Sequence, residues 1–303
     1  MATTTSNLGL TKPNYADAAD VGILNSNFDV LDREVVKRTN VHNLLDNSDF
    51  RNPVNQRGQT SYTGAVYGID RWKGTTSTSA LTVNDGYVTF GAGDTLNQHR
   101  QFINNDEVNL YGKTVTVACE DSSGNVYCAS GVCPNATPSS NTFVGGNNVN
   151  GGLVRLVFDT SSNIYIQIYH PAGTISLRWV ALYEGAYTVE TLPAYQYRGY
   201  AAELAECLRY YYKANDQYSI VPYYFSTPER YYTVMLPAQM RIPPTVQYLN
   251  TSGEYKGGWL PTGATVSIVS TSPAHFTMSC VGGDISETDR TLLFMTYAAS
   301  ADL

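Results

Sequence analysis

The stretch NIYIQIYH, residues 163–170, alternates apolar and polar side chains along its length. Successive side chains of a strand point to opposite faces, so one face would carry three isoleucines and the other two tyrosines and a glutamine: Ile164, Ile166 and Ile168 against Tyr165, Gln167 and Tyr169. Similar short segments, separated by polar turns, recur from residue 60 to residue 190. Their spacing predicts an all-β sandwich rather than strands that alternate with helices.

Two segments interrupt or follow these strands. Residues 134–152, PNATPSSNTFVGGNNVNGG, are polar and rich in glycine, so we expect a long loop. Residues 198–212, RGYAAELAECLRYYY, follow a linker marked by Pro193 and predict a helix, with an apolar stripe of Ala201, Leu204, Leu208 and Tyr211. Further strand patterns come after it and predict a second, smaller β domain that runs to residue 303.

The segment NLLDNSDFRNPVNQRG, residues 43–58, begins with an apolar pair and then turns polar. An active-site loop, a domain junction and ordinary surface would all produce such a pattern. Leu44, Leu45 and Phe50 are spaced to anchor the entry into the sandwich. We therefore interpret the segment as a junction rather than a site.

Residues 17–38 predict a helix, with Asp17 as its N-cap and Lys37 and Arg38 favourable at its C-terminus. Its apolar residues follow the a and d spacing of a coiled coil: Val21, Leu24, Phe28, Leu31 and Val35. Little more than two heptads are present, so a single helix packed on its own domain is the alternative. A helix of this length is marginal alone in water, and its stripe must therefore meet an apolar partner.

Composition excludes several classes of partner. Only 15% of the residues are charged, the net charge is −7 and no run of lysine and arginine exceeds two residues, so we expect no nucleic-acid partner. No apolar stretch approaches the ~20 residues that span a bilayer, so we expect no membrane insertion. The N-terminus lacks a basic start and an apolar run, which predicts a protein made in a cytoplasm without a signal peptide.

The cysteines are five in number and scattered: Cys119, Cys128, Cys133, Cys207 and Cys280. A turn at Ser123–Gly124 would place Cys119 opposite Cys128 across a hairpin. A disulfide and a pair of small buried residues both fit that arrangement, and we favour the second. Neither the cysteines nor the four histidines have the spacing of a zinc site, so we predict no metal.

Motifs for catalysis are missing from the sequence: it has no nucleophile elbow, P-loop, dinucleotide fingerprint or metalloprotease histidine pair. Acid pairs such as Asp70 with Asp85, or Asp284 with Glu287, resemble ordinary loop acids. We therefore predict no enzyme, no catalytic residues and no cofactor.

Aromatic residues with polar neighbours are the most prominent chemical feature. Tyr255 and Trp259 lie in the glycine-rich stretch EYKGGWLPTG, residues 254–263, and Tyr248 precedes it. Rings exposed on a loop can stack on sugar faces, which makes these three residues candidates for glycan binding. The alternative is that they pack beneath the loop.

Three stretches together resemble tail-fibre proteins from phages and prophages of Gram-positive-type hosts. NLGLTKPNYADAADVGILNSNFDVLD resembles their N-terminal segment. NLLDNSDFRNPVNQRG with YGIDRW resembles the start of their carbohydrate-binding-like sandwich, and SLRWVALYEGAYTVETLPAYQYRGYAAELAECLRYYY its last strand and the following helix. The resemblance covers most of residues 7–212. Trp72 and Trp179 match motif positions, and we expect both to be core residues.

The resemblance implies a homotrimeric fibre of the virion tail, assembled in the host cytoplasm. Its N-terminus would attach to tail or baseplate proteins, and its C-terminal head would bind a bacterial cell-surface polysaccharide. The expected fold is mainly β, in four parts: an attachment segment with a trimerising coiled-coil helix (1–42), a jelly-roll-like, carbohydrate-binding-like β-sandwich (43–192), a linker and helix (193–212), and a β-sandwich receptor-binding head (213–303). The alternatives are a glycan-cleaving tailspike, a bacterial carbohydrate-binding module and the fibre of a contractile phage-tail-like particle.

Overall fold

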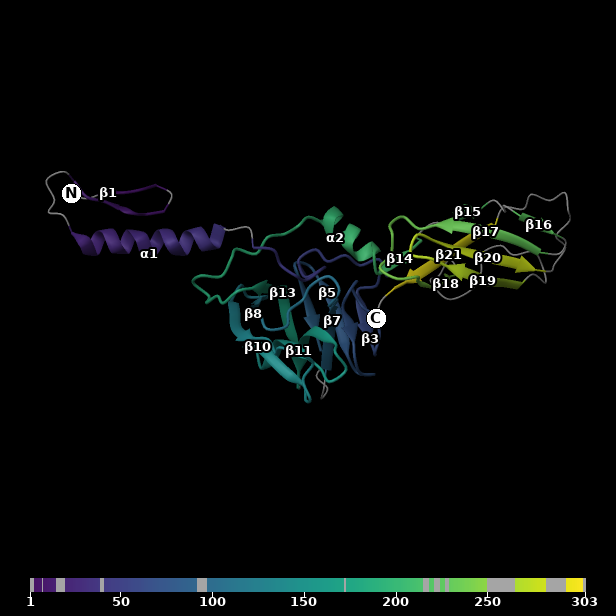
Figure 1. Cartoon of the computed structure of the whole chain (residues 1–303), viewed down its shortest axis with the longest axis horizontal. Helices are drawn as coiled ribbons and strands as arrows, with labels where there is room; N and C mark the ends of the chain where they lie inside the picture. Colours follow the sequence, from purple (N-terminus) through teal and green to yellow (C-terminus); the bar gives the residue numbers. More distant parts are fainter. Residues whose placement is uncertain are drawn as a thin grey trace. The chain divides into compact units, whose positions relative to one another are not determined.

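The computed structural model describes eleven stretches of the chain: residues 3–6, 8–14, 20–38, 41–91, 97–171, 173–214, 218–220, 224–226, 229–249, 265–281 and 293–301. Within them the protein is mainly β, with two helices and several antiparallel sheets (Figure 1). The chain divides into two compact units. The first comprises residues 1–51, 63–66 and 74–197, and the second comprises residues 52–62, 67–73 and 198–303.

The first unit begins with a small hairpin and a helix. The hairpin consists of β1 (Thr3–Thr4) and β2 (Thr11–Lys12), and the helix is α1 (Val21–Arg38). The side chain of Asp20 accepts a hydrogen bond from the N–H of Gly22 at 2.7 Å, which is the geometry of an N-cap. The predicted cap, Asp17, lies outside the described residues.

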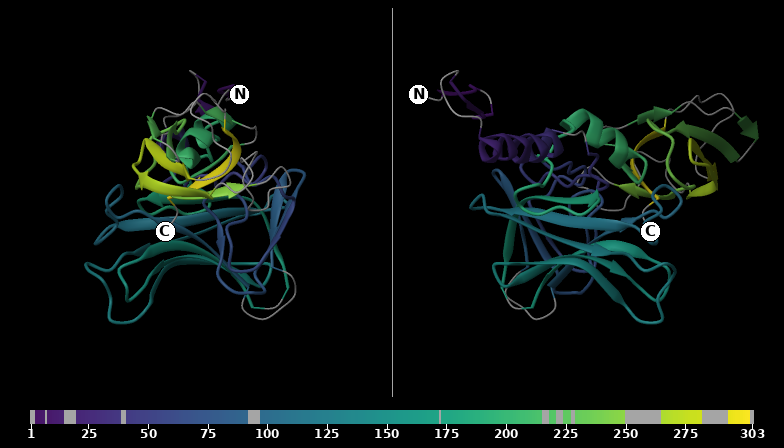
Figure 2. Two further views of the ribbon diagram at one scale, coloured as in Figure 1. Left: turned by 90° about the vertical axis from the view of Figure 1, so that its right-hand side faces the viewer. Right: turned by 60° about the vertical axis from the view of Figure 1, so that its left-hand side comes forward.

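Two antiparallel sheets contain the remaining strands of the first unit (Figure 2). The five-stranded sheet has the order β10 (Thr142–Val149), β11 (Gly152–Phe158), β12 (Ile164–His170), β7 (Asn97–Ile103), β4 (Lys73–Gly74). The six-stranded sheet has the order β3 (Ser61–Thr63), β5 (Ala80–Asn84), β6 (Tyr87–Phe90), β13 (Ile175–Glu184), β8 (Thr114–Asp121), β9 (Val126–Val132). β10 contacts both β8 and β9, and the Asn147 amide donates to the Val117 carbonyl at 2.9 Å.

The alternation in residues 163–170 is present in β12. Its three isoleucines are buried, and they pair in register with Phe158, Leu156 and Val154 of β11, which are also buried. Trp179 of β13 is buried as well, which confirms its predicted place in a core.

The predicted loop over residues 134–152 is wrong in part, because it contains the edge strand β10. Glycine permits this strand to approach its neighbours closely. A Cβ at Gly145, whose φ is +61°, would lie 2.6 Å from the Ala129 carbonyl oxygen and 3.0 Å from a Val117 methyl. Glycine in this stretch therefore does not indicate a loop. It allows the strand to pack closely against a neighbouring backbone.

The junction segment extends the six-stranded sheet alongside β13. Backbone hydrogen bonds join Leu44 to Leu182 at 3.0 Å, Phe50 to Arg178 at 2.7 Å and Val180 to Ser48 at 3.0 Å. The structure thus explains the polar sequence: Asn47, Ser48 and Asp49 are buried where the segment pairs with β13, and Leu45 and Phe50 enter the core.

The second unit contains α2 and two four-stranded antiparallel sheets. In one sheet β21 (Leu293–Ser300) pairs with β14 (Tyr211–Lys213), β15 (Tyr218–Ile220) and β18 (Thr245–Leu249). The other has the order β16 (Tyr224–Ser226), β17 (Glu229–Met235), β20 (His275–Val281), β19 (Thr265–Thr271). One buried cluster includes side chains of both sheets, among them Tyr297, Phe276, Met278 and Val234. Trp72, which also belongs to this unit, is fully buried, as predicted.

The second predicted helix is shorter than the sequence indicates. α2 spans Tyr200–Leu208, and Tyr211 begins β14. The helix buries Glu203 and Cys207, whereas Ala201 of the predicted stripe is exposed. Glu203 is tolerated there because Arg198 Nε donates to its carboxylate at 2.9 Å.

The predicted opposition of Cys119 and Cys128 is wrong by one residue. β8 and β9 pair Cys119 with Tyr127 and Ala118 with Cys128. Adjacent residues of a strand point to opposite faces, so the two thiols lie on different sides of the sheet. All five cysteines are free in the structure.

We expect every cysteine to be alkylated without prior reduction once the protein is denatured. In the native state, Cys128 should react first, because its side chain is half-buried whereas the other four are buried. Burial raises the pKa of the Cys133 thiol to about 11, which lowers its thiolate fraction further. Mass spectrometry of timed alkylation tests this order, and a surviving Cys119–Cys128 peptide would contradict it.

Candidate functional site

The predicted oligomerisation stripe of α1 is largely exposed. Val21 is 69% exposed, Leu24 52%, Phe28 56% and Val35 62%, and Leu31 is half-buried. These values describe one copy of the chain, and within that copy the stripe has little apolar cover.

The N-terminal hairpin is joined to α1 beside this stripe. Asn27 Nδ2 donates to the Thr11 carbonyl at 2.9 Å, and the Thr11 N–H donates to Asn27 Oδ1 at 2.9 Å. The amide thus reproduces the pair of hydrogen bonds that a neighbouring strand would make. The contact fixes the hairpin on the helix and leaves four stripe residues more than half exposed.

The predicted glycan-binding residues are only partly within the described stretches. Tyr255 and Trp259 lie outside them. Tyr248 lies in β18, where it pairs in register with Tyr297 of β21, a buried core residue. The structure places Tyr248 on a strand of the second unit and leaves its predicted association with the other two rings untested.

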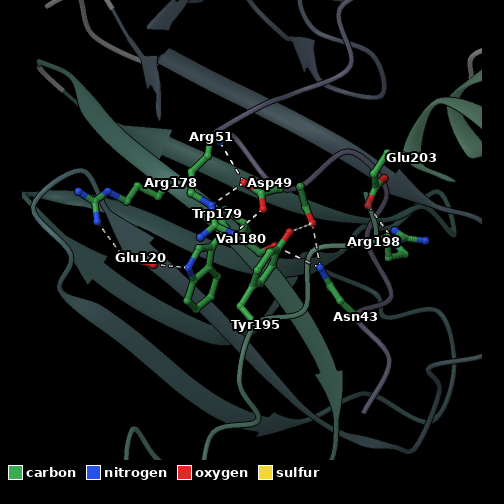
Figure 3. Close-up of polar contacts among 11 residues, drawn as sticks. Asn43, Asp49, Arg51, Glu120, Arg178, Trp179, Val180, Tyr195, Arg198 and Glu203 are labelled. Atoms are coloured by element: carbon green, nitrogen blue, oxygen red, sulfur yellow. Dashed lines mark hydrogen bonds and ion pairs between the residues drawn. The ribbon is translucent and has the colours of Figure 1, made fainter. Parts of the chain in front are cut away.

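Around Trp179 the first unit contains a cluster that the sequence did not predict (Figure 3). The Trp179 and Tyr195 rings stack with centroids 4.7 Å apart and an interplanar angle of 18°. Trp179 Nε1 donates to Glu120, whose other oxygen lies 3.0 Å from Arg178 Nη1. The Tyr195 hydroxyl lies 3.2 Å from that of Ser48. The cluster therefore fixes the segment after β13 to the junction segment.

Arg51 extends this cluster. Its Nη2 lies 2.5 Å and its Nε 2.9 Å from the two oxygens of Asp49, and its guanidinium carbon lies 5.6 Å from the Tyr195 ring centroid. The hydrogen bond to Asp49 is the main cause of a raised pKa at Arg51. Because the cation is already paired and the neighbouring rings stack on each other, we assign the cluster a structural role.

The second unit holds a separate network of arginine and tyrosine. Buried Asp70 accepts from Arg57 Nη1 at 2.7 Å and from Gln56 Nε2 at 2.9 Å. The Arg57 guanidinium lies 3.7 Å from the centroid of Tyr211, and Gln56 also donates to the Tyr211 carbonyl at 2.7 Å. The second half of the junction segment is thereby fixed to the start of β14.

Tyr210 is the centre of an adjoining contact. The Arg71 guanidinium lies 3.4 Å from its ring centroid, and those of Arg209 and Arg241 lie at 6.0 Å. Arg71 adopts a left-handed backbone, with φ of 71°. Backbone hydrogen bonds also close the turn of the YGIDRW motif, from Gly68 N–H to the Trp72 carbonyl at 3.0 Å and from Trp72 N–H to the Ile69 carbonyl at 3.1 Å. The turn and the stacking contact together give the motif a defined structural position.

The acid pairs considered from sequence form no catalytic arrangement among the described residues. Asp70 is bound to Arg57, and Asp85 is exposed at the turn between β5 and β6. Asp284 and Glu287 lie outside the described stretches. In the part of the chain that the structure describes, no group of three metal-ligating side chains occurs and no helix is long and apolar enough to cross a membrane.

The chain matches no protein-family model, no curated protein and no solved structure. Any function must therefore be argued from the residues and their geometry.

Proposed function

We propose that this chain is a homotrimeric tail fibre of a phage virion. Its N-terminal hairpin and helix would attach to the tail or baseplate, and its C-terminal unit would bind a host cell-surface polysaccharide. The first unit would serve as a jelly-roll-like sandwich between them, and α2 as the linker helix. The observation that carries the proposal is the apolar stripe of α1.

The stripe supports an oligomer for two reasons. Its a and d spacing is that of a helix that packs against copies of itself, and four of its residues are more than half exposed in a single chain. The polar residues that flank it, such as Asn25 and Asp32, are typical of the rim of a coiled coil.

A head role for the second unit rests on its chemistry. It contains its own core and two sheets, and the aromatic candidates Tyr248, Tyr255 and Trp259 belong to it. Three copies on one fibre would raise avidity by about 10²–10⁴-fold over one weak site.

Adsorption of the full chain to host cells tests the head. We expect Trp259→Ala to weaken binding to cells and to purified wall polysaccharide at least tenfold, with little change in melting temperature, because stacking on a sugar face requires the ring. Tyr197→Ala, which removes a 44% exposed ring from the first unit, is the matched control and should leave binding unchanged.

The same experiment distinguishes the alternatives. Release of sugar fragments would identify a tailspike rather than a binding fibre. Undiminished binding by the Trp259 variant would place the glycan site elsewhere.

A further inference from the structure

One face of the five-stranded sheet carries arginine and aromatic side chains in register. The central row runs across three strands, from Arg155 of β11 through Gln167 of β12 to Arg100 of β7. A row on one side of it contains Phe143, Val157, Tyr165 and Phe102, and a row on the other contains Leu153, Tyr169 and Gln98. Residues directly opposite each other share a face, so these side chains form one surface, opposite to the isoleucines of β12. Val157, Tyr165 and Gln167 are buried in this surface, Arg100 and Arg155 are half-buried, and Phe143 is exposed.

Hydrogen bonds connect this surface across the strands. Arg155 Nε donates to Gln167 Oε1 at 2.9 Å, and Gln167 Nε2 donates to Gln98 Oε1 at 2.8 Å. Arg100 Nη2 donates to the same Gln98 oxygen at 3.1 Å. The acceptors are neutral amides, so the network orients both guanidinium groups without neutralising them.

The aromatic rings hold the same two cations. The Arg155 guanidinium lies 3.8 Å from the Phe143 centroid and 5.8 Å from that of Tyr169. The Arg100 guanidinium lies 4.3 Å from the Tyr165 centroid. Phe143 is itself 52% exposed, so the surface presents an accessible ring beside a cation.

Neither arginine forms an ion pair with a carboxylate among the described residues. Arg51, Arg57, Arg178, Arg198 and Arg209, in contrast, are all paired. Arg100 Nε is buried and has no hydrogen-bond partner in the same part of the chain. Asp159 lies within electrostatic range of Arg100, but its oxygens already accept from Ser161 and Asn163.

We propose that this sheet face binds an acidic polysaccharide strand. Carboxylate or phosphate groups would pair with Arg100 and Arg155, and a sugar ring would pack on Phe143. The two arginines lie on strands separated by one other strand, so their backbones are about 10 Å apart. Successive acidic groups along a polymer can therefore reach both.

Charge complementarity favours this occupant over the alternatives. A nucleic acid is disfavoured because tracking a phosphate backbone relies on clustered basic side chains, and no run of lysine and arginine in the chain exceeds two residues. A second copy of the chain would bring the same two cations against each other. The site is independent of the glycan site proposed for the second unit, and a fibre could use both.

Direct binding of the full chain to defined polymers tests the inference. The probes are polygalacturonate for carboxylate, poly(glycerol phosphate) for phosphate, and dextran as a neutral polymer, compared by titration calorimetry at low and high salt. We expect the wild type to bind at least one acidic polymer, more weakly at high salt, and not to bind dextran. Arg100→Gln and Arg155→Gln should each weaken binding about tenfold, because each removes a charge-assisted contact.

Arg178→Gln is the matched control, because it removes an arginine of the other sheet that is paired with Glu120. This variant should leave the affinity for the acidic polymers unchanged. Trp259→Ala should also leave it unchanged, and that result would distinguish this site from the site proposed for the second unit. Unchanged affinity in both glutamine variants would overturn the proposal. The proposal would also be overturned if neither acidic polymer binds, or if dextran binds equally well. It would likewise be overturned if the wild type self-associates and the two glutamine variants abolish that self-association.

Discussion

Phe28→Asp is expected to convert the protein from a trimer to a monomer at micromolar concentration. Phe28 is the central residue of the α1 stripe and is 56% exposed in a single chain. Burial of such a side chain contributes about 1.5–3 kcal/mol, and three copies would each lose that contribution. The substitution would also bring three carboxylates together at the axis of the bundle, which opposes assembly further.

Light scattering on the purified full chain measures this outcome. The matched control is Ser26→Asp, which adds the same charge two residues away at an exposed position outside the stripe. We expect the control to retain the mass of the wild type. A monomeric wild type, or a Phe28→Asp variant that remains trimeric, would contradict the assignment of the stripe.

The helix illustrates what the sequence can predict locally. Its periodicity predicted its presence and its end at Arg38, because a 3.6-residue repeat depends only on nearby positions. The hydrogen bonds between Asn27 and Thr11 were not predictable in this way, because Asn27 has the same polarity as any rim residue. Asn27 acquires its partner only because the hairpin lies beside the helix.

Strand register was the main source of error in the first unit. The residues around Cys119 and Cys128 clearly predict a hairpin, but the Asp121 carboxylate accepts from Ser123 and Asn125 and sets a longer turn than the one assumed. A shift of one residue reverses the face of every side chain, which separates the two thiols. β10 was missed for a related reason. Glycine is needed at position 145 because a neighbouring backbone lies too close for a Cβ, and the local sequence gives no sign of that neighbour.

The network around Asp70 could not be predicted because its members are distant in the sequence. Gln56, Arg57 and Asp70 precede Tyr211 by about 140 residues or more, yet they group with it in the second unit. Periodicity carries no information on such contacts. The only signal was the presence of charged residues in motifs that are otherwise apolar or small, such as Asp70 and Arg71 in YGIDRW.

That network makes Asp70→Ala the most destabilising single substitution that we predict. Asp70 is 1% exposed and its partner Arg57 has a side chain only 16% exposed, so removal of the carboxylate leaves a largely buried cation without its ion-pair partner. Such a loss costs about 3–5 kcal/mol, a large part of the stability of an ordinary domain. Urea unfolding followed by tryptophan fluorescence measures it, since Trp72 is buried two residues away.

Comparison with an exposed ion pair isolates the effect of burial. Glu184→Ala removes the partner of Lys113, and the side chains of that pair are 56% and 40% exposed, so we expect a loss of at most about 1 kcal/mol. Adding Arg57→Met to Asp70→Ala should restore part of the lost stability, because the cation left by the first substitution is then removed, although the stacking of Arg57 on Tyr211 is also lost. If Asp70→Ala lowers the free energy of unfolding no more than Glu184→Ala does, the ion pair between Asp70 and Arg57 does not hold the junction segment in the second unit. A double variant less stable than Asp70→Ala would instead assign the main contribution to the arginine–tyrosine stack.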